Sequence, residues 1–560
     1  MSKNFSLGNL LISANKISES QLGEALCQQK KERKKCIEEI LVELGFVNEE
    51  DILEVLENQL KIPSIDLANY TINPKVISII PENIARRYGL IPIDKKNNKL
   101  IIAVSDPFNI IAIDDIKLLT GMEIEVVVSL KSVILKTIDK FYRVEKTKKV
   151  LEELEESYIP SSIKDLEDGD LSDVNSAPVV KLVNSIVVQA IKVKASDIHI
   201  EPFENSVRVR YRIDGDLQEI MKFSIKSHMA IVTRVKIMGK MDIAERRIPQ
   251  DGRVETELEG KEIDMRISTL PTVHGEKIAI RLLDRNGFSF LKEDLGFEDR
   301  DLKIFNKIIK QPYGIVLVTG PTGSGKSTTL YTILKDLNDE EKNIVTIEDP
   351  VEYKLEGINQ VQINNKSGLT FANGLRSILR QDPDIIMIGE IRDSETAKIA
   401  IRASITGHLV LSTLHTNDTA STIVRLIDMG IEPYLLSTSV IGIISQRLVK
   451  KLCSNCKTPY EPSLHEKKML GLNLEDKATL HKPVGCNKCF KGYRGRIAIH
   501  EIMDIDKDIR KLIDNRATTD ELKEASIKNG MITLYDNVVN LALKGITSVE
   551  EVFRIGYTLD

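Results

Sequence analysis

The chain has 560 residues, which is too long for one hydrophobic core and predicts roughly three or four domains. Hydrophobic residues make up 42% and charged residues 29%, which is typical of a soluble globular protein and excludes a mostly disordered chain. The formal net charge of -5 gives no overall sign of a protein that binds polyanions. No apolar run reaches the roughly 18 to 20 residues that span a bilayer, and the N-terminus shows no signal peptide. We therefore expect a cytoplasmic protein without a transmembrane segment, recruited to the inner face of the cell membrane by a partner.

Residues 1–142 are expected to form an N-terminal regulatory or docking domain in two parts. Residues 1–60 contain one apolar pattern twice, about 30 residues apart, and each copy predicts a short helix, a turn and a second amphipathic helix. Residues 61–142 have a mixed α/β pattern. The helices and strands expected there are 81–88, 100–104, 124–128 and 130–142.

The rest of the chain divides into a linker and two α/β blocks. Residues 143–175 are charged and poor in aromatic residues, which predicts a flexible linker. The first block is 176–290, with strands expected at 197–200, 207–212 and 262–267 and a helix at 229–238. The second is 291–560, with strands expected at 315–319, 344–347, 385–388 and 409–413, two cysteine pairs within 453–489 and mostly helix over 505–556. Alternation of strands and helices in the second block predicts a parallel sheet.

The strongest motif begins at Gly320 and fits the pattern G-x-x-x-x-G-K-[ST]. Its nucleotide-binding residues are expected to be Gly320, Pro321, Thr322, Gly323, Ser324, Gly325, Lys326, Ser327 and Thr328. Glycines let successive N–H groups point at phosphates, and the helix that follows adds its positive end. Lys326 is expected to reach the β- and γ-phosphates and Ser327 to ligate Mg²⁺. The alternative is a glycine-rich turn without nucleotide, but a strand leading in and a helix leading out favour ATP.

Acidic and histidine residues follow three of the expected strands, where an open parallel sheet places its ligand. Glu348 and Glu352 follow the strand at 344–347, Glu390 follows 385–388, and His415 follows 409–413. Glu390 is the natural residue to polarise water, because carboxylates beside a triphosphate repel it unless they face Mg²⁺ or water. A single acid of this kind could be a solvated helix cap, but three clusters beside a P-loop indicate nucleotide hydrolysis.

Seven segments resemble those of the secretion ATPases, and within them the type IV pilus assembly and type II secretion motors. The segments are 196–202 (SDIHIEP), 210–215 (RYRIDG), 249–253 (PQDGR), 320–328 (GPTGSGKST), 346–352 (TIEDPVE), 379–393 (LRQDPDIIMIGEIRD) and 407–416 (GHLVLSTLHT). The resemblance implies a multidomain α/β chain: an N-terminal helical and α+β domain, a small PAS-like α/β domain called N2 at 176–290, and a RecA-like ATPase domain at 291–560. It also implies a homo-hexameric ring with ATP held between subunits.

The resemblance assigns roles to several residues of this chain. Glu348 and Glu352 fall in the family's acidic box, Glu390 in its Walker B motif and His415 in its histidine box. The family's trans-acting arginines map onto Arg266 and Arg281. An arginine placed across an interface stabilises charge that develops on the transferred phosphoryl group. The alternative for Arg266 is an ion pair with Asp264, two residues away on the same strand face.

Four cysteines form two Cys-x-x-Cys pairs, which are Cys453, Cys456, Cys486 and Cys489. In a chain without an export signal this spacing favours a metal over disulfides, and four thiolates suit a closed tetrahedral structural Zn²⁺ site. The 29 residues between the pairs exceed the usual spacing of about 15–20, so a loop is expected between them. The alternative is four reduced thiols without metal. The family resemblance agrees with zinc, because assembly motors carry this insert.

The N-terminal repeat resembles the cyclic di-GMP-binding domain found on some of these motors. In that domain each repeat begins Arg-Leu-Gly and ends with Gln. Here Ser6 and Cys36 stand at the arginine positions, while Gln29 and Gln59 keep the final one. Neither serine nor cysteine can replace the planar, bidentate guanidinium. This favours a helical module that docks an inner-membrane platform protein over one that binds cyclic di-GMP.

Two related functions and two unrelated ones remain to be weighed. The preferred function is a hexameric ATPase motor for type IV pilus assembly, and the alternative is the type II secretion ATPase that drives pseudopilus assembly and protein secretion. A nucleic-acid translocase would need a basic channel or stacking platforms, and this chain has no tryptophan and a net negative charge. A binding module without turnover is disfavoured by Lys326 and Glu390. We therefore expect no nucleic-acid partner.

Overall fold

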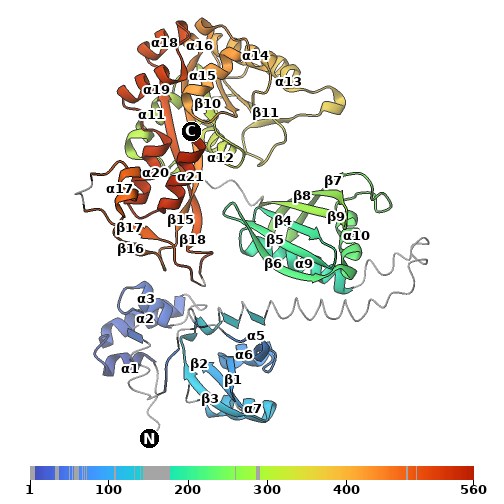
Figure 1. Cartoon of the computed structure of the whole chain (residues 1–560), viewed down its shortest axis with the longest axis vertical. Helices are drawn as coiled ribbons and strands as arrows, with labels where there is room; N and C mark the ends of the chain where they lie inside the picture. Colours follow the sequence, from blue (N-terminus) through green and yellow to red (C-terminus); the bar gives the residue numbers. More distant parts are fainter. Residues whose placement is uncertain are drawn as a thin grey trace.

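The computed structural model describes residues 7–31, 37–48, most of 51–142, 177–258, 260–284, 291–473, 477–486 and 488–559 (Figure 1). Within these residues, none of the helices combines the length and apolar character needed to cross a membrane. The predicted linker at 143–175 lies outside the described residues, as do Ser6, Cys36 and Gln59 and the side chain of Gln29.

The N-terminal helices are α1 (Leu7–Ser13), α2 (Glu19–Lys31) and α3 (Ile37–Glu43). Helices α1 and α2 confirm the helix–turn–helix unit predicted for the first copy of the repeat. Apolar residues of both copies share one buried cluster, in which Leu10 and Leu11 pack with Ile40 and Leu41. The two copies therefore stabilise each other, as a repeat that cannot bury its apolar face alone must.

The next part is a small sheet with helices packed around it. Its elements are α5 (Pro74–Ile77), α6 (Glu82–Tyr88), β1 (Leu90–Lys96), β2 (Lys99–Val104), α7 (Ile110–Thr120) and β3 (Glu123–Val128). The strand order is β1-β2-β3, antiparallel between the first two and parallel between the last two. Elements β2, β3 and α6 confirm the predicted pattern, whereas β1 and α7 were not predicted.

An antiparallel sheet follows, with strand order β6-β5-β4-β9-β8-β7. Its strands are β4 (Asp197–Pro202), β5 (Ser206–Ile213), β6 (Asp216–Ser224), β7 (Gln250–Leu258), β8 (Lys261–Thr272) and β9 (Gly275–Asp284). Helices α9 (Ala177–Lys192) and α10 (His228–Met238) bury one face of the sheet (Figure 1). Residues two apart on a strand share a face, and the other face carries many charged side chains. They are Asp197 and Glu201 of β4, Arg208, Arg210 and Arg212 of β5, and Lys277 and Arg281 of β9.

The second large sheet has the strand order β12-β11-β13-β14-β10-β15-β18. Its strands are β10 (Gly314–Thr319), β11 (Ile344–Glu348), β12 (Asn359–Gln362), β13 (Ile385–Ile388), β14 (Leu409–Leu414), β15 (Val440–Leu452) and β18 (Tyr493–Asp504). All neighbours are parallel except β15 and β18. The helices around it are α11 (Asp299–Ile309), α12 (Lys326–Leu337), α13 (Phe371–Ile378), α14 (Ser394–Ile405), α15 (Thr419–Asp428) and α16 (Pro433–Ser439). The order puts β10 beside β14, with β13 and β11 next, so the ends of these four strands meet at one edge.

Strands β15 and β18 run on beyond this sheet toward a small hairpin at the cysteine pairs (Figure 1). The elements of this end are β16 (Thr458–Tyr460), α17 (Leu464–Met469), β17 (Leu480–Lys482), α18 (Lys507–Asp514), α19 (Thr519–Lys528), α20 (Leu534–Leu543) and α21 (Val549–Leu559). Helices α18 to α21 confirm the helical character predicted for 505–556. Helices α20 and α21 pack on the extended strands through a cluster that includes Val449 and Ile499.

Candidate active site

The loop between β10 and α12 has the backbone of a phosphate-binding loop. Gly320, Gly323 and Gly325 have φ angles of 143°, 78° and 91°, a region that side chains rarely adopt. Helix α12 begins at Lys326, and the hydroxyl-bearing Ser327 is exposed at its first turn. The loop therefore presents a helix N-terminus and free hydroxyl, the donor set that a nucleotide with Mg²⁺ requires.

The Lys326 ammonium lies back on the loop. Its Nζ donates to the carbonyl oxygens of Gly320 at 2.8 Å and Pro321 at 3.0 Å. Burial lowers the pKa of Lys326 to about 8, and the nearby charge of Glu390 acts in the opposite direction. A cation held in a partly dry loop is placed to meet phosphate oxygens, and an arriving negative charge would favour its protonated form.

Glu390 follows β13 and lies beside two basic side chains. Arg392 donates to its Oε1 at 2.5 Å, and His415 Nε2 lies 3.5 Å from its Oε2. Burial alone would raise the pKa of Glu390, but the Arg392 hydrogen bond and the charges of Arg392 and His415 outweigh burial and lower it. Glu390 is therefore a carboxylate at neutral pH, the form that accepts a proton from water.

Glu348 is the most buried acid of the site, with 4% of its surface exposed. Its carboxylate accepts from the hydroxyls of Thr346 and Tyr331 and, at 3.2 Å, from the side chain of Gln360. Burial raises its pKa, while these hydrogen bonds act against the rise. Tyr331 also accepts a hydrogen bond from the backbone N–H of Glu352 at 3.1 Å, so one tyrosine orients both parts of the acidic segment.

Arg266 on β8 reaches this acidic segment from the six-stranded sheet. Its Nη2 lies 2.7 Å from Oε2 of Glu352 in the same chain. The alternative partner, Asp264, accepts two hydrogen bonds from Arg253 at 2.9 and 2.6 Å. The site thus gathers residues from both large sheets, and Arg266 contacts it within one subunit.

Arg281 is the register partner of Arg266 on the neighbouring strand β9. Its Nε donates to Asp197 at 3.1 Å, and its side chain is 59% exposed. It therefore pairs with an acid of its own sheet, and its predicted action across a subunit interface stays a prediction.

The four cysteines of the two pairs come together at the end of β15. Their sulfur atoms all lie within 4.8 Å of one another. The Sγ distances are 3.9 Å between Cys453 and Cys486, 3.6 Å between Cys456 and Cys489, and 3.6 Å between Cys486 and Cys489. Four ligands at a Zn–S distance of about 2.3 Å in a tetrahedron lie about 3.8 Å apart, so these donors fit Zn²⁺.

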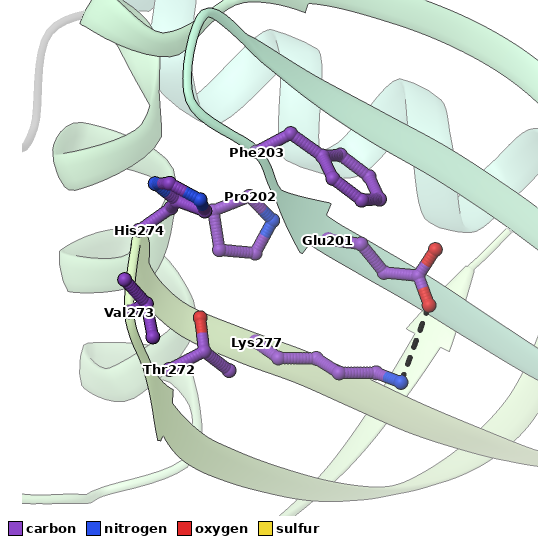
Figure 2. A pocket seen from close by; sticks show the side chains of 7 residues that line it. All are labelled: Glu201, Pro202, Phe203, Thr272, Val273, His274 and Lys277. Atoms are coloured by element: carbon purple, nitrogen blue, oxygen red, sulfur yellow. Dashed lines mark ion pairs between the residues drawn. The ribbon is translucent and has the colours of Figure 1, made fainter.

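A hollow of about 420 Å³ lies elsewhere, at the tip of the β8–β9 hairpin (Figure 2). Its lining comes from the end of β4 and from the hairpin, and Glu201 pairs with Lys277 at 3.2 Å along one side. Lys277, Arg208 and Arg210 surround the Glu201 carboxylate and outweigh its burial, so its pKa falls to about 2. None of the predicted nucleotide-site residues lines this hollow.

Four residues of the site were not singled out from the sequence. Tyr331 and Arg392 position Glu348 and Glu390. On β15, Gln446 contacts the phosphate-binding loop from behind, and Arg447 lies beside Gly320. Arg392 lies inside the family-like segment 379–393. Its place two residues after Glu390 could have predicted that its side chain pairs with that carboxylate. Gln446 and Arg447 had no local signal, because the loop that they contact is more than a hundred residues away.

Comparisons with known proteins agree with this arrangement. The model of the family described as type II/IV secretion system protein matches residues 172–554, and that of the MshEN domain matches residues 60–148. The chain is 44% identical over 556 residues to the type IV pilus assembly ATPase PilB of Myxococcus xanthus, covering 98% of each. It is 42% identical over 535 residues to the type II secretion system protein E of Xanthomonas campestris pv. campestris, covering 92% of each. The structure of the ATPase DotB of Yersinia pseudotuberculosis has a TM-score of 0.52 at 20% identity over 68% of this chain and 94% of that one, which shows the fold alone.

Proposed function

Because this chain belongs to the family of type II/IV secretion system proteins, we propose that it is the ATPase motor that powers type IV pilus assembly. It is an enzyme that hydrolyses ATP. One observation carries the choice of process: the relative named as a pilus assembly ATPase aligns over 98% of both chains. The alternative is type II secretion, which is favoured by a relative aligned over 92% of both chains.

In the proposed reaction Lys326 and the loop glycines bind the β- and γ-phosphates. Ser327 would hold Mg²⁺, which supplies charge that neutralises the phosphate oxygens. The Glu390 carboxylate takes the proton of the attacking water, and His415, 3.5 Å from it, orients that carboxylate. Glu348 and Glu352 extend this acidic edge toward Arg266.

We place the reaction in a homo-hexamer with ATP between subunits, as the family membership suggests. The contact between Arg266 and Glu352 supports a motor, since it joins the two large sheets of one subunit at the nucleotide edge. ATP binding there would compete with Glu352 for the arginine, so the two sheets would move relative to each other as the nucleotide changes. Arg281 would act at the same edge, through its strand neighbour Arg266.

We assign Zn²⁺ to the four cysteines as a structural metal. The donor set is closed, because four thiolates leave no coordination position for a substrate. The role is supported by the place of the cluster at the end of β15, where the metal would hold the loop between the two cysteine pairs.

The N-terminal domain is proposed to dock a platform protein at the inner face of the membrane. The matched MshEN domain at 60–148 supports a role in regulation or docking. Cyclic di-GMP remains the second candidate ligand of this domain.

The experiment that tests the function is deletion of the gene, with complementation by the wild-type chain and by Lys326→Ala. We expect loss of surface pili, restored only by the wild-type chain, while secreted proteins are unchanged. Loss of secreted proteins with intact pili would contradict the pilus assignment and favour type II secretion.

A further inference from the structure

Strand β15 passes behind the phosphate-binding loop, and Gln446 holds the loop at two points. Gln446 is 2% exposed. Its side-chain Nε2 donates to the carbonyl oxygen of Ser324 at 2.9 Å, and its Oε1 accepts from the hydroxyl of Thr329 at 2.6 Å. One amide thus ties the loop to the first turn of α12.

The loop glycines are packed against the same residue. A Cβ on Gly320 would lie 2.4 Å from the backbone oxygen of Gln446, and a Cβ on Gly325 would lie 2.7 Å from its side-chain nitrogen. Both ends of the loop therefore touch Gln446 so closely that a methyl group does not fit. The loop conformation depends on this strand as well as on its own sequence.

The next residue, Arg447, connects the loop to the turn that follows β14. Arg447 is 6% exposed. Its Nη2 donates to the backbone oxygen of Asn417 at 2.9 Å, and its Nη1 lies 3.2 Å from the position of a Cβ on Gly320. Asn417 comes two residues after His415, so a single guanidinium contacts the segment that carries the histidine and lies beside Gly320 of the phosphate-binding loop.

Two acidic residues near the arginine act on it electrostatically. Burial lowers the pKa of Arg447, and the charges of Glu501 and Asp418 act against that change. Glu501 accepts from the backbone N–H and hydroxyl of Thr419 at 3.0 and 2.6 Å, at the start of α15. The turn at 415–419 is therefore fixed between Arg447 and Glu501.

We propose that Gln446 and Arg447 are positioning residues for ATP hydrolysis, with separate tasks. Gln446 keeps the phosphate-binding loop in the shape that binds ATP. Arg447 couples that loop to the His415 turn and so to Glu390, which His415 contacts. The second task rests on the proposed roles of Glu390 and His415.

The first test uses the full-length protein and separates ATP binding from turnover. Gln446→Met keeps the volume and removes both hydrogen bonds. We expect the Kd of a fluorescent ATP analogue to rise at least tenfold, while kcat at saturating ATP changes less than about threefold. Thr329→Val removes one of the same two bonds and should act in the same direction by a smaller factor. Unchanged Kd in the folded Thr329→Val protein would overturn the role of Gln446, even if Gln446→Met does not fold.

The second test concerns Arg447, for which we expect the reverse of the Gln446 result: a change in turnover with little change in ATP binding. Arg447→Lys keeps the charge but loses the planar guanidinium, whose Nη2 donates to Asn417 and whose Nη1 donates to the backbone oxygen of Gln446 beside Gly320. We expect kcat to fall at least tenfold, with the Kd of the analogue within about threefold. If Arg447 acts through the histidine, His415→Ala and the double variant should have nearly the same kcat as each other. Additive losses, or a change in Kd alone, would overturn the coupling.

Arg554→Lys is the matched control. Arg554 donates to the backbone oxygen of Leu448 at 3.1 Å on the same strand, beyond the loop. The kcat and Kd of Arg554→Lys should stay within about twofold of the wild type. A tenfold loss of kcat in this variant would show that any disturbance of β15 lowers turnover, and would overturn the specific role of Arg447. Glu390→Gln, measured in parallel, separates a failure of the proposed function from a failure of the role proposed for Arg447. Full turnover in Glu390→Gln would contradict the proposed function, whereas normal turnover in Arg447→Lys alone would contradict only this inference.

Discussion

The guanidinium of Arg266 lies 2.7 Å from the carboxylate of Glu352, and this ion pair joins strand β8 of the antiparallel sheet to the acidic segment after β11. Both side chains are partly exposed, at 26% and 30%. An exposed pair of this kind contributes at most about 1 kcal/mol to stability. In the proposed mechanism its place beside the nucleotide edge matters more than its energy, because the same arginine would move from Glu352 to a phosphate.

Replacement of this arginine should therefore affect catalysis and not folding. We expect Arg266→Ala to lower ATPase activity at least tenfold and to shift the Tm by less than about 3 °C. Arg253→Ala is the contrasting control, since it removes the two hydrogen bonds that Arg253 donates to the buried carboxylate of Asp264, which is 1% exposed, and should lower the Tm. Full ATPase activity in Arg266→Ala would show that the arginine has no part in hydrolysis.

Mutations should separate the two steps of the proposed reaction, which are ATP binding and ATP turnover. Lys326→Ala removes the cation that binds phosphate, so we expect loss of both ATP binding and turnover. Glu390→Gln keeps the shape and removes the proton acceptor, so ATP should still bind while turnover falls at least a hundredfold. Binding of a fluorescent ATP analogue and release of phosphate measure the two steps. Full hydrolysis by either variant is incompatible with the site as assigned.

Affinity for ATP should decrease as the pH rises through about 8. Burial lowers the pKa of Lys326 from 10.5 to about 8 in the free protein, so the ammonium that ATP needs is lost above that value. Below pH 8 the lysine is already protonated and the affinity should be flat. Above about pH 8 binding must take up a proton, because the phosphate charge favours the protonated lysine. Calorimetry in buffers of different ionisation enthalpy measures this uptake. An absence of proton uptake at pH 9 would contradict the lowered pKa of Lys326.

Metal analysis of the purified chain should find about one zinc ion per chain. Cys453→Ser combined with Cys456→Ser removes half of the ligands, so we expect the metal to be lost and the Tm to fall. Cys27→Ser, outside the two cysteine pairs, serves as the control and should leave the metal content unchanged. The same zinc content in the double variant and the wild type would rule out the four-cysteine site.

Local sequence was sufficient for the strands that carry the site. β10 and β13 are short apolar runs with fully buried residues, and the residues that follow them are the motif itself. The family membership, the ATPase activity and the mixed α/β fold inferred from those motifs are confirmed. The sulfur atoms of the cysteine pairs also meet as their spacing predicted.

Contacts between distant segments could not be predicted in the same way. Gln446 meets Thr329 and Ser324 across 117 and 122 residues, and nothing near Gln446 in the sequence marks it as a partner. The predicted action of Arg266 across a subunit interface stays a prediction. Its contact with Glu352 within one chain could not be predicted, because it depends on how the two sheets meet. Strand β15 also escaped prediction as a single long strand, because Gly442 and the polar residues from Gln446 onward interrupt its apolar pattern.

Strand β15 has one part under the phosphate-binding loop and its last residue next to Cys453. Its first half, up to Ser445, pairs with β10, and β18 pairs with it from Gly442 to Leu452. From Gln446 to the end of the strand lie six residues, about 20 Å at the rise of an extended strand. A metal bound by the four cysteines would therefore anchor the far end of the strand that supports the phosphate-binding loop.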